Sequence, residues 1–209
     1  MNVMKEKSLK RLLLIRHCES SHAQEQYIGR TDSSLTQAGV VQAHKLAKRL
    51  KGLACAHVVS SPSRRVFETS RLAMEGTGLA IELDVDLCEI DFGKWEGMSF
   101  GEISASYPQL VEQWARGRMD FCFPDGESLS AFWERINRAA RRISKTREET
   151  VVVFTHGGVI RFLLCHFLRI DPRSHLMFEV SPGSITSIHL HDGEAVLSGL
   201  NDRCHLEEF

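Results

Sequence analysis

The sequence predicts an α/β fold: a three-layer sandwich with a mostly parallel central sheet, helices on both faces and a small cap segment. Short apolar runs alternate along the 209-residue chain with segments in which apolar residues recur at helical spacing. Alternation of this kind is typical of parallel sheets whose strands are joined by helical crossovers. The length suits one domain, which we predict to span residues 1–209, with a cap-like insertion at about 87–125.

The first half of the chain contains three apolar runs and two helical patterns. Thr36 is a suitable N-cap for a helix that ends before Gly52, and Pro62 is suited to open a second helix. We therefore predict, in order, a strand at 10–16, a loop at 18–35, a helix at 36–50, a strand at 56–60, a helix from 62 to about 76 and a strand at 80–85.

The second half begins with an irregular stretch, 87–125, in which we predict one short helix at 99–106 and another after Pro108. A strongly amphipathic pattern then predicts a long helix at 128–147, and we interpret its basic residues as a solvated face. The remaining predictions are a strand at 150–155, a helix through 160–167 and a hairpin of 184–190 with 194–200 that turns at Asp192-Gly193.

Composition excludes several classes of protein. The formal net charge is −1, so no overall field attracts nucleic acid or an anionic membrane. No apolar run approaches the roughly 20 residues that span a bilayer, and residues 1–10 do not resemble a secretory signal. The six cysteines are scattered without a Cys-x-x-Cys pair, which favours a cytoplasmic protein with reduced thiols and neither disulfides nor a zinc site.

Two histidines stand just beyond apolar runs. His17 follows the run at 12–15 and Arg16, and His156 follows the run at 151–154 and Thr155. Ligands of open α/β sheets bind beyond the carboxyl ends of the strands, so both imidazoles can face one crevice. Arg16 beside the first histidine, with further arginines after the strand at 56–60, indicates that this crevice holds an anion.

These side chains suit phosphoryl transfer, which needs a nucleophile, cations on the non-bridging oxygens and an acid for the leaving oxygen. His17 is the candidate nucleophile, because nearby arginines favour its neutral, nucleophilic form. Each side chain taken singly has a common structural explanation, and only their arrangement at three strand ends supports the hypothesis. The other candidates are Arg16 and Arg65 as phosphate ligands, Gly157-Gly158 as backbone donors, His156 as a donor to the transition state, and Glu89 as acid and then base.

Four segments, in order, resemble the sequence blocks of the histidine phosphatase superfamily, in its phosphoglycerate-mutase-like branch. Residues 16–20 resemble its Arg-His-Gly-Glu-Thr signature, and 60–66 resemble Ser-Ser-Pro-Leu-x-Arg-Ala, which makes Arg65 rather than Arg64 the second phosphate arginine. Residues 88–97 resemble Glu-x-x-Phe-Gly-x-Trp-Glu-Gly, and 155–161 resemble the Thr-His-Gly-Gly block. Residues 29–32, 35–36 and 39 also match.

The resemblance implies a two-step mechanism without metal or cofactor. His17 would become phosphohistidine while Glu89 protonates the leaving alcohol, and Glu89 would then assist the attack of water. The catalytic set implied is His17, Glu89, His156, Arg16 and Arg65, and the predicted substrate-binding set is Arg16, Ser20, Gly29, Arg65 and Gly157.

Three positions depart from the family pattern. Cys18 replaces the usual glycine, and we consider three roles for it: a nucleophile, a redox-sensitive thiol or an inert small side chain. No cysteine has the Cys-x5-Arg spacing of thiol phosphatases, which argues against the first role. Ala23 replaces a phosphate-binding asparagine whose place Ser20 or Gln24 can take, and Ser34 replaces a common proline.

We predict a phosphomonoester hydrolase acting on a small phosphorylated metabolite. The stretch 123–129 resembles the smaller phosphatases, including the α-ribazole phosphatases of cobalamin synthesis, so α-ribazole 5′-phosphate is the named substrate candidate. Two alternatives are phosphoglycerate-mutase-type phosphotransfer and a catalytically impaired phosphate-binding regulatory module. We predict no nucleic-acid or membrane partner, and the C-terminal hairpin edge could pair in a homodimer.

Overall fold

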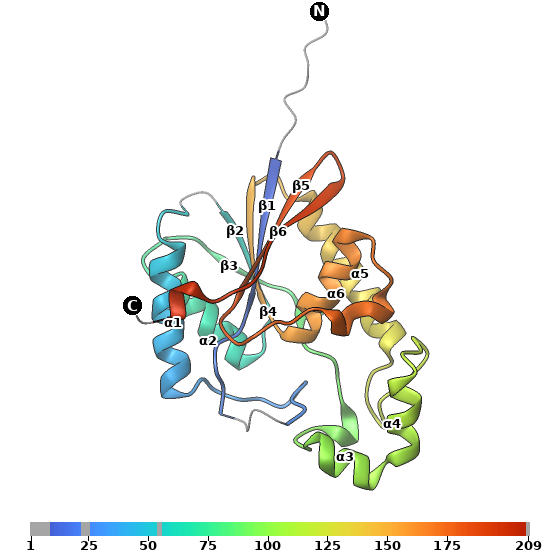
Figure 1. Ribbon diagram of the computed structural model, residues 1–209. Helices are drawn as coiled ribbons and strands as arrows, with labels where there is room; N and C mark the ends of the chain where they lie inside the picture. Colours follow the sequence, from blue (N-terminus) through green and yellow to red (C-terminus); the bar gives the residue numbers. More distant parts are fainter. Residues whose placement is uncertain (1–8, 22–25, 54–55, 208–209) are drawn as a thin grey trace, which may run out of the picture.

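The computed structural model describes residues 9–21, 26–53 and 56–207, which contain one six-stranded sheet. β1 (Leu9–Arg16), β2 (Ala56–Ser60), β3 (Ile81–Leu83) and β4 (Thr150–Thr155) pair in parallel, while β5 (Ile185–His191) and β6 (Glu194–Asp202) pair antiparallel at one edge. The strand order is β3-β2-β4-β1-β5-β6 (Figure 1). The predicted α/β class with a mostly parallel sheet is therefore confirmed.

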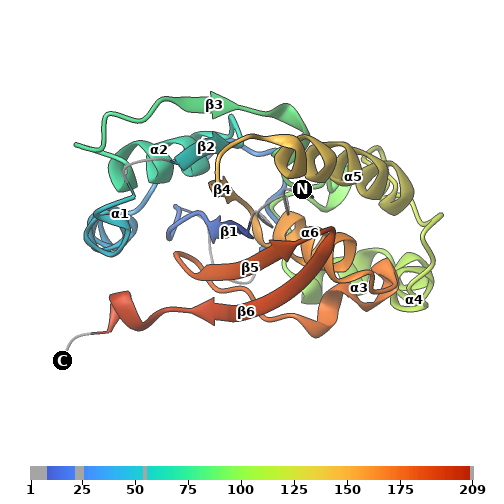
Figure 2. The ribbon, with the colours of Figure 1, turned by 90° about the horizontal axis from the view of Figure 1, so that it is seen from above.

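Helices cover both faces of the sheet (Figure 2). α1 (Gln37–Leu50) and α2 (Arg64–Ala73) lie on one face, and α5 (Leu129–Lys145) and α6 (Gly157–Leu168) lie on the other. The apolar runs of β1 and β4 are buried on both sides, because successive side chains of a strand point to opposite faces. Leu13, Ile15, Val152 and Phe154 pack with α1 and α2, whereas Leu12, Leu14, Val151 and Val153 pack with α5 and α6.

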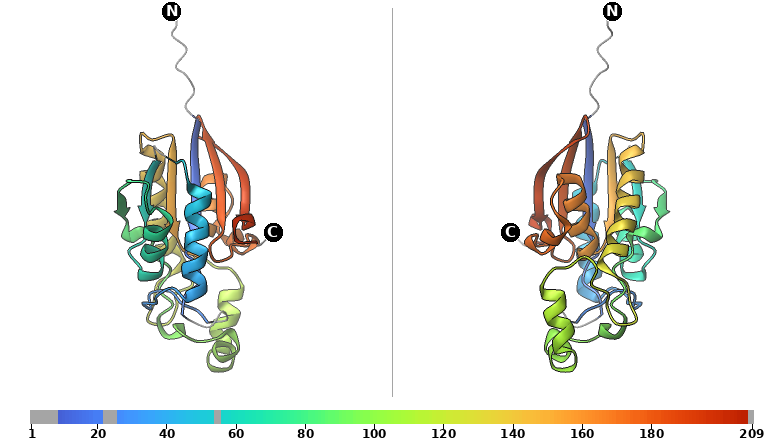
Figure 3. Two further views of the ribbon diagram at one scale, coloured as in Figure 1. Left: turned by 90° about the vertical axis from the view of Figure 1, so that its left-hand side faces the viewer. Right: turned by 90° about the vertical axis from the view of Figure 1, so that its right-hand side faces the viewer.

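Residues 87–125 lie beyond the carboxyl ends of the parallel strands (Figure 1 and Figure 3). They contain the 3-10 helix η2 (Gly93–Trp95), α3 (Phe100–Ser106), which begins with a Ser99–Glu102 capping box, and α4 (Pro108–Ala115). Trp95 is fully buried at the centre of an aromatic cluster that includes Tyr27, Trp114 and Phe123. This cluster joins the segment to the loop that carries Tyr27.

Element boundaries differ from the prediction by a few residues, and at Thr36, Asp84 and Ser128 a side chain that bonds to the backbone explains the difference. β3 is shorter than the predicted 80–85, because the Asp84 side chain accepts a hydrogen bond from the Asp86 N–H and begins η1 (Val85–Leu87). Thr36 and Ser128 are N-caps that precede their helices, and α2 begins at Arg64 rather than at Pro62. Two further 3-10 helices are η3 (Pro172–Met177) and η4 (Cys204–Leu206).

The interpretation of the basic residues of α5 as a solvated face is wrong for Arg135, which is 6% exposed. Its guanidinium forms a bidentate ion pair with Glu127 and donates to three backbone carbonyls, so the charge is compensated inside the protein. Arg138 and Arg142 are half exposed, and they pair with Asp84 and Asp86.

Within residues 9–21, 26–53 and 56–207, no helix is both long and apolar enough to cross a bilayer.

Candidate active site

The register of the sheet brings His17 and His156 to the same edge. Arg16 lies opposite Thr155 in the parallel pair of β1 and β4, and the His17 N–H donates to the Thr155 carbonyl at 2.9 Å. The two imidazoles follow these adjacent strand ends, with ring centroids 5.4 Å apart and ring planes inclined by 67°. Both rings are buried, and because they lie this close together, the two predicted histidines share one site.

Arg65, at the start of α2, lies between the two imidazoles. Its Nε donates to His17 Nε2 at 3.4 Å, and its Nη2 donates to His156 Nδ1 at 3.0 Å. The same guanidinium donates to the carbonyls of Gly29 at 2.8 Å and Thr31 at 3.0 Å, and burial lowers its pKa. The arginine is therefore fixed by the loop at 28–31 as well as by the two rings.

The hydrogen bonds of His17 define its tautomer. Nδ1 lies 2.8 Å from the Cys18 carbonyl, which can only accept, so Nδ1 carries the proton and Nε2 presents a lone pair. Burial lowers the pKa of His17 well below 6.5, and the charges of Arg16 and Arg65 lower it further. The ring is therefore neutral at physiological pH, and its unprotonated nitrogen is Nε2.

The Glu89 carboxylate lies at the same end of the sheet and is 8% exposed. Its Oε2 accepts from the Gly158 N–H at 2.9 Å, and its Oε1 accepts from the Ile90 N–H at 3.0 Å. A side chain at Gly158 would collide with this carboxylate, because an added Cβ would lie 2.4 Å from Oε1. The glycine thus permits the helix terminus to approach the acid closely.

Arg16 and Arg161 add positive charge to this end of the sheet. Burial lowers the pKa of Arg16 to about 10; Glu89 opposes this shift, and the charges of Arg161 and Arg65 reinforce it. Arg16 Nη1 donates to the Val180 carbonyl at 2.6 Å, whereas its buried Nε has no partner among the described residues. The cavities at this end of the sheet are lined by four arginines, Arg16, Arg65, Arg161 and Arg203, and two carboxylates, Glu19 and Glu89, and this excess of positive charge suits an anion.

The family model described as "Histidine phosphatase superfamily (branch 1)" matches residues 12–203 of the chain. The chain belongs to this superfamily. It is 31% identical over 201 residues to phosphoserine phosphatase 1 of Hydrogenobacter thermophilus, with 95% of each protein covered. It is 34% identical to phosphoglycerate mutase-like protein 4 of Arabidopsis thaliana, covering 94% of this chain and 87% of the relative. The crystal structure of the α-ribazole phosphatase from Shigella flexneri superposes with a TM-score of 0.83 at 26% identity, covering 92% and 96% of the two chains.

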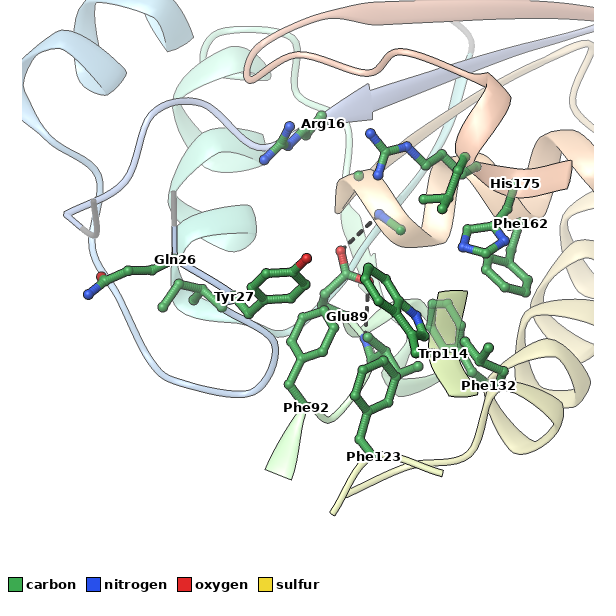
Figure 4. A pocket seen from close by; sticks show the side chains of 17 residues that line it. Arg16, Gln26, Tyr27, Glu89, Phe92, Trp114, Phe123, Phe132, Phe162 and His175 are labelled. Atoms are coloured by element: carbon green, nitrogen blue, oxygen red, sulfur yellow. Dashed lines mark hydrogen bonds between the residues drawn. The ribbon is translucent and has the colours of Figure 1, made fainter. Parts of the chain in front are cut away.

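Two adjoining cavities of this histidine phosphatase share Arg16, Gln26, Ile28 and Glu89. The smaller, about 210 Å³, is polar and is also lined by His17, Ser20, Gln42, Arg65 and Arg203, among others. The larger, about 330 Å³, has aromatic walls (Figure 4). Glu89 lines both cavities, so its carboxylate can be reached from either one.

The remaining predicted residues differ in whether they line these two cavities. Ser20 lines the polar cavity, and Gly157 lines the aromatic cavity beside Arg16. Gly29 lines neither of these two cavities; its N–H donates to Glu96 and its carbonyl accepts from Arg65. His156 also lines neither, because Nδ1 accepts from Arg65 and Nε2 donates to Ser61 Oγ at 3.1 Å. The predicted donation from His156 to a phosphoryl oxygen requires the Nε2–H to leave Ser61 Oγ, because Nδ1 carries no proton.

Cys18 points into the apolar cluster between β1 and α1, away from both cavities. Burial raises the pKa of its thiol to about 12, against a smaller opposite effect of the hydrogen bond with Thr69. Of the three roles considered, this geometry supports an inert small side chain, because the thiolate is disfavoured. Ala23, Gln24 and Cys55 lie outside the described residues.

The prediction missed several residues at this site. Ser61 and Arg161 occur within the sequence blocks at 60–66 and 155–161, so both could have been included among the predicted site residues from those blocks alone. Tyr27 and Trp114 line the aromatic cavity from a loop and from α4, where no sequence pattern marks them. Glu127 and Arg135 are eight residues apart across a helix start, and only the fold shows that they pair beside Glu89.

We expect His17 to remain neutral as the pH is lowered through 6.5, because its pKa lies well below that value in the folded protein. NMR of isotopically labelled imidazole can follow this ring, assigned by comparison with the H17N variant. The unfolded ring takes up a proton near pH 6.5 and the folded ring does not, so its contribution lowers the free energy of unfolding as the pH falls below 6.5. Titration of the folded ring near pH 6.5 would contradict this.

Proposed function

We propose that this protein hydrolyses phosphomonoesters through a phosphohistidine intermediate on His17, without a metal ion. The observation that carries the proposal is the arrangement of His17 Nε2. The ring is neutral by burial, and the Nδ1 bond to the Cys18 carbonyl leaves Nε2 unprotonated on the wall of a polar cavity. The Nε2 lone pair accepts a long hydrogen bond of 3.4 Å from Arg65 Nε, which a bound phosphoryl group would replace.

In the first step, Nε2 of His17 attacks phosphorus, an N–P bond forms and the bond from phosphorus to the leaving oxygen breaks. The proton on Glu89 passes to that oxygen, which leaves as an alcohol. In the second step Glu89 accepts a proton from water as the water oxygen attacks phosphorus, the N–P bond breaks and inorganic phosphate departs. Each step leaves His17 and Glu89 ready for the next, so the cycle closes without another reactant.

In this proposal, Arg16 and Arg65 stabilise the negative charge of the phosphoryl oxygens. Arg65 is buried and Arg16 is partly buried, and both line the polar cavity together with His17. Guanidiniums fixed by backbone carbonyls need little reorganisation when charge accumulates on the phosphoryl oxygens. Loss of one such donor typically costs roughly 10²–10³ in rate.

Hydrolysis is favoured over the two alternatives by specific features. A mutase must shield its phosphoenzyme from water, and the segment between Glu89 and α5 contains only the short helices η2, α3 and α4 among the described residues. Similarity to the plant phosphoglycerate mutase-like protein keeps phosphotransfer as the second candidate. An impaired phosphate-binding module is disfavoured, because Cys18 leaves His17, Glu89 and both arginines in place.

The aromatic cavity supports a ring-bearing leaving group. Tyr27, Phe92, Phe123 and Trp114 gather around Glu89, with Phe162 and His175 on the other side (Figure 4). A planar group fills such walls well, whereas the short polar leaving group of phosphoserine would leave most of them uncovered. Among the names of the relatives, α-ribazole, which carries an aromatic base, fits this cavity best, so α-ribazole 5′-phosphate is our proposed substrate and cobalamin synthesis the proposed setting.

Replacing His17 by Ala should lower the hydrolysis of p-nitrophenyl phosphate at least about a thousandfold, because no other group presents a lone pair to phosphorus. The control H44A removes an exposed histidine of α1 and should retain full activity. Robust hydrolysis by H17A would refute the assignment of His17 as the nucleophile.

A parallel assay with 3-phosphoglycerate and a bisphosphate primer separates the alternative functions. Isomerisation indicates a mutase, and phosphate binding with neither reaction indicates a regulatory module.

Replacing Trp114 by Ala should lower kcat/KM for naphthyl phosphate by about tenfold, because a ring that contacts the leaving group is removed. The value for phosphoserine should change little. F67A, which removes a partly exposed aromatic of α2, serves as the control. Equal losses on both substrates, or a wild-type preference for phosphoserine, would contradict the aromatic leaving group.

A further inference from the structure

A buried ion pair lies behind the segment that carries Glu89. Arg135 of α5 and Glu127, two residues before α5, form a bidentate contact with Nε–Oε1 of 2.7 Å and Nη2–Oε2 of 2.9 Å. The side chains are only 7% and 15% exposed. Removing both charges from water costs several kcal/mol unless further hydrogen bonds compensate, so the other partners of this pair show what it holds.

Those partners are backbone groups on both sides of Glu89. Arg135 donates from Nη1 to the carbonyls of Asp86 at 2.8 Å and Cys88 at 2.6 Å, and from Nη2 to the carbonyl of Glu89 itself at 2.9 Å. Glu127 completes the other side, because its N–H donates to the Asp91 carbonyl at 2.9 Å. The ion pair thus fixes the backbone from 86 to 91.

The segment it fixes has no strand or α-helix of its own at Glu89. η1 ends at Leu87 and η2 begins at Gly93, and their last and first hydrogen bonds reach only Cys88 and Phe92, so residues 89–91 lie outside regular structure. Among the described residues, the hydrogen bonds of the Glu89 side chain are those that its carboxylate oxygens accept from the N–H groups of Gly158 and Ile90. A substrate oxygen that takes a proton from Glu89 competes for that carboxylate, and the backbone must then hold the side chain in place.

We propose that Arg135 and Glu127 are positioning residues that hold Glu89 against the leaving oxygen, an inference that rests on the proposed hydrolysis. Neither residue lines either of the two adjoining cavities, so both act through Glu89. The planar guanidinium is required because it donates to five oxygens on four residues at once, and lysine cannot reproduce that geometry. Glu127 keeps the guanidinium oriented and neutralises its charge.

Substrates with different leaving groups distinguish a positioning role for Arg135 and Glu127 from a general loss of structure, which would lower activity on all of them. p-Nitrophenolate departs with little help from an acid, whereas phenolate needs protonation. The quantity to compare is kcat/KM, which includes steps only up to formation of the phosphoenzyme. R135K should lower kcat/KM for phenyl phosphate at least about tenfold, part of the roughly 10²–10⁴ that general acid catalysis supplies, and should leave p-nitrophenyl phosphate nearly unchanged. E127Q, which keeps the shape of the pair, should shift the ratio in the same direction.

The matched control is R138A, which removes another α5 arginine bound to the same segment through the Asp86 carboxylate but does not contact residues 88–91. Its ratio of phenyl to p-nitrophenyl activity should equal that of the wild type. In an E89Q background, R135K should produce no further change in that ratio, because the group on which it acts is already absent.

Equal losses on both substrates, or an additive effect in the E89Q background, would overturn the positioning role while leaving the proposed hydrolysis intact. If R135K fails to fold, E127Q and its combination with E89Q decide the question. Failure of the wild-type protein to hydrolyse either phosphate would instead refute the proposed function, so the two failures are distinguishable.

Discussion

The site depends on one buried guanidinium. Arg65 carries a positive charge at 1% exposure, and the carbonyls of Gly29 and Thr31 together with the two imidazoles accept its hydrogen bonds. Those carbonyls are oriented because the Glu96 carboxylate accepts hydrogen bonds from the N–H groups of the same loop. Burial is the largest cause that lowers the pKa of both imidazoles, and the charge of Arg65 lowers it further, after Arg16 for His17 and directly after burial for His156. The positions of His17, His156 and Arg65 are thus set by one shared contact.

The sheet supplies the precision that this contact needs. β1 and β4 are apolar on both faces and fixed in register, so His17 and His156 leave the sheet at the same level. Helices packed on both faces prevent either strand from shifting by one residue, because such a shift would reverse every buried side chain. Glu89, by contrast, lies on irregular backbone and obtains its place from side-chain contacts.

This difference explains what could be predicted from sequence. The strand ends, the helices and the convergence of His17 with His156 follow from periodicity and from the topology of parallel sheets, and the sequence blocks indicate Arg65. The burial of Arg135 could not be predicted, because an arginine at the edge of an amphipathic stripe has the same pattern whether it faces water or a carbonyl. The shortening of β3 depended on the Asp84 hydrogen bond, and the aromatic cavity depended on how α4 approaches the loop at 26–28, a long-range contact that no local pattern encodes.

In the proposed mechanism, the phosphoryl group is transferred from the substrate to Nε2 of His17. The most direct measurement is to mix the protein with a phosphomonoester, quench it in base, where phosphohistidine is stable, and map the phosphoryl group by mass spectrometry and phosphorus NMR. We expect a single phosphorylated residue, His17, with the N–P bond at Nε2. A phosphoryl group on Cys18, a serine or another histidine, or turnover with no covalent intermediate, would contradict it.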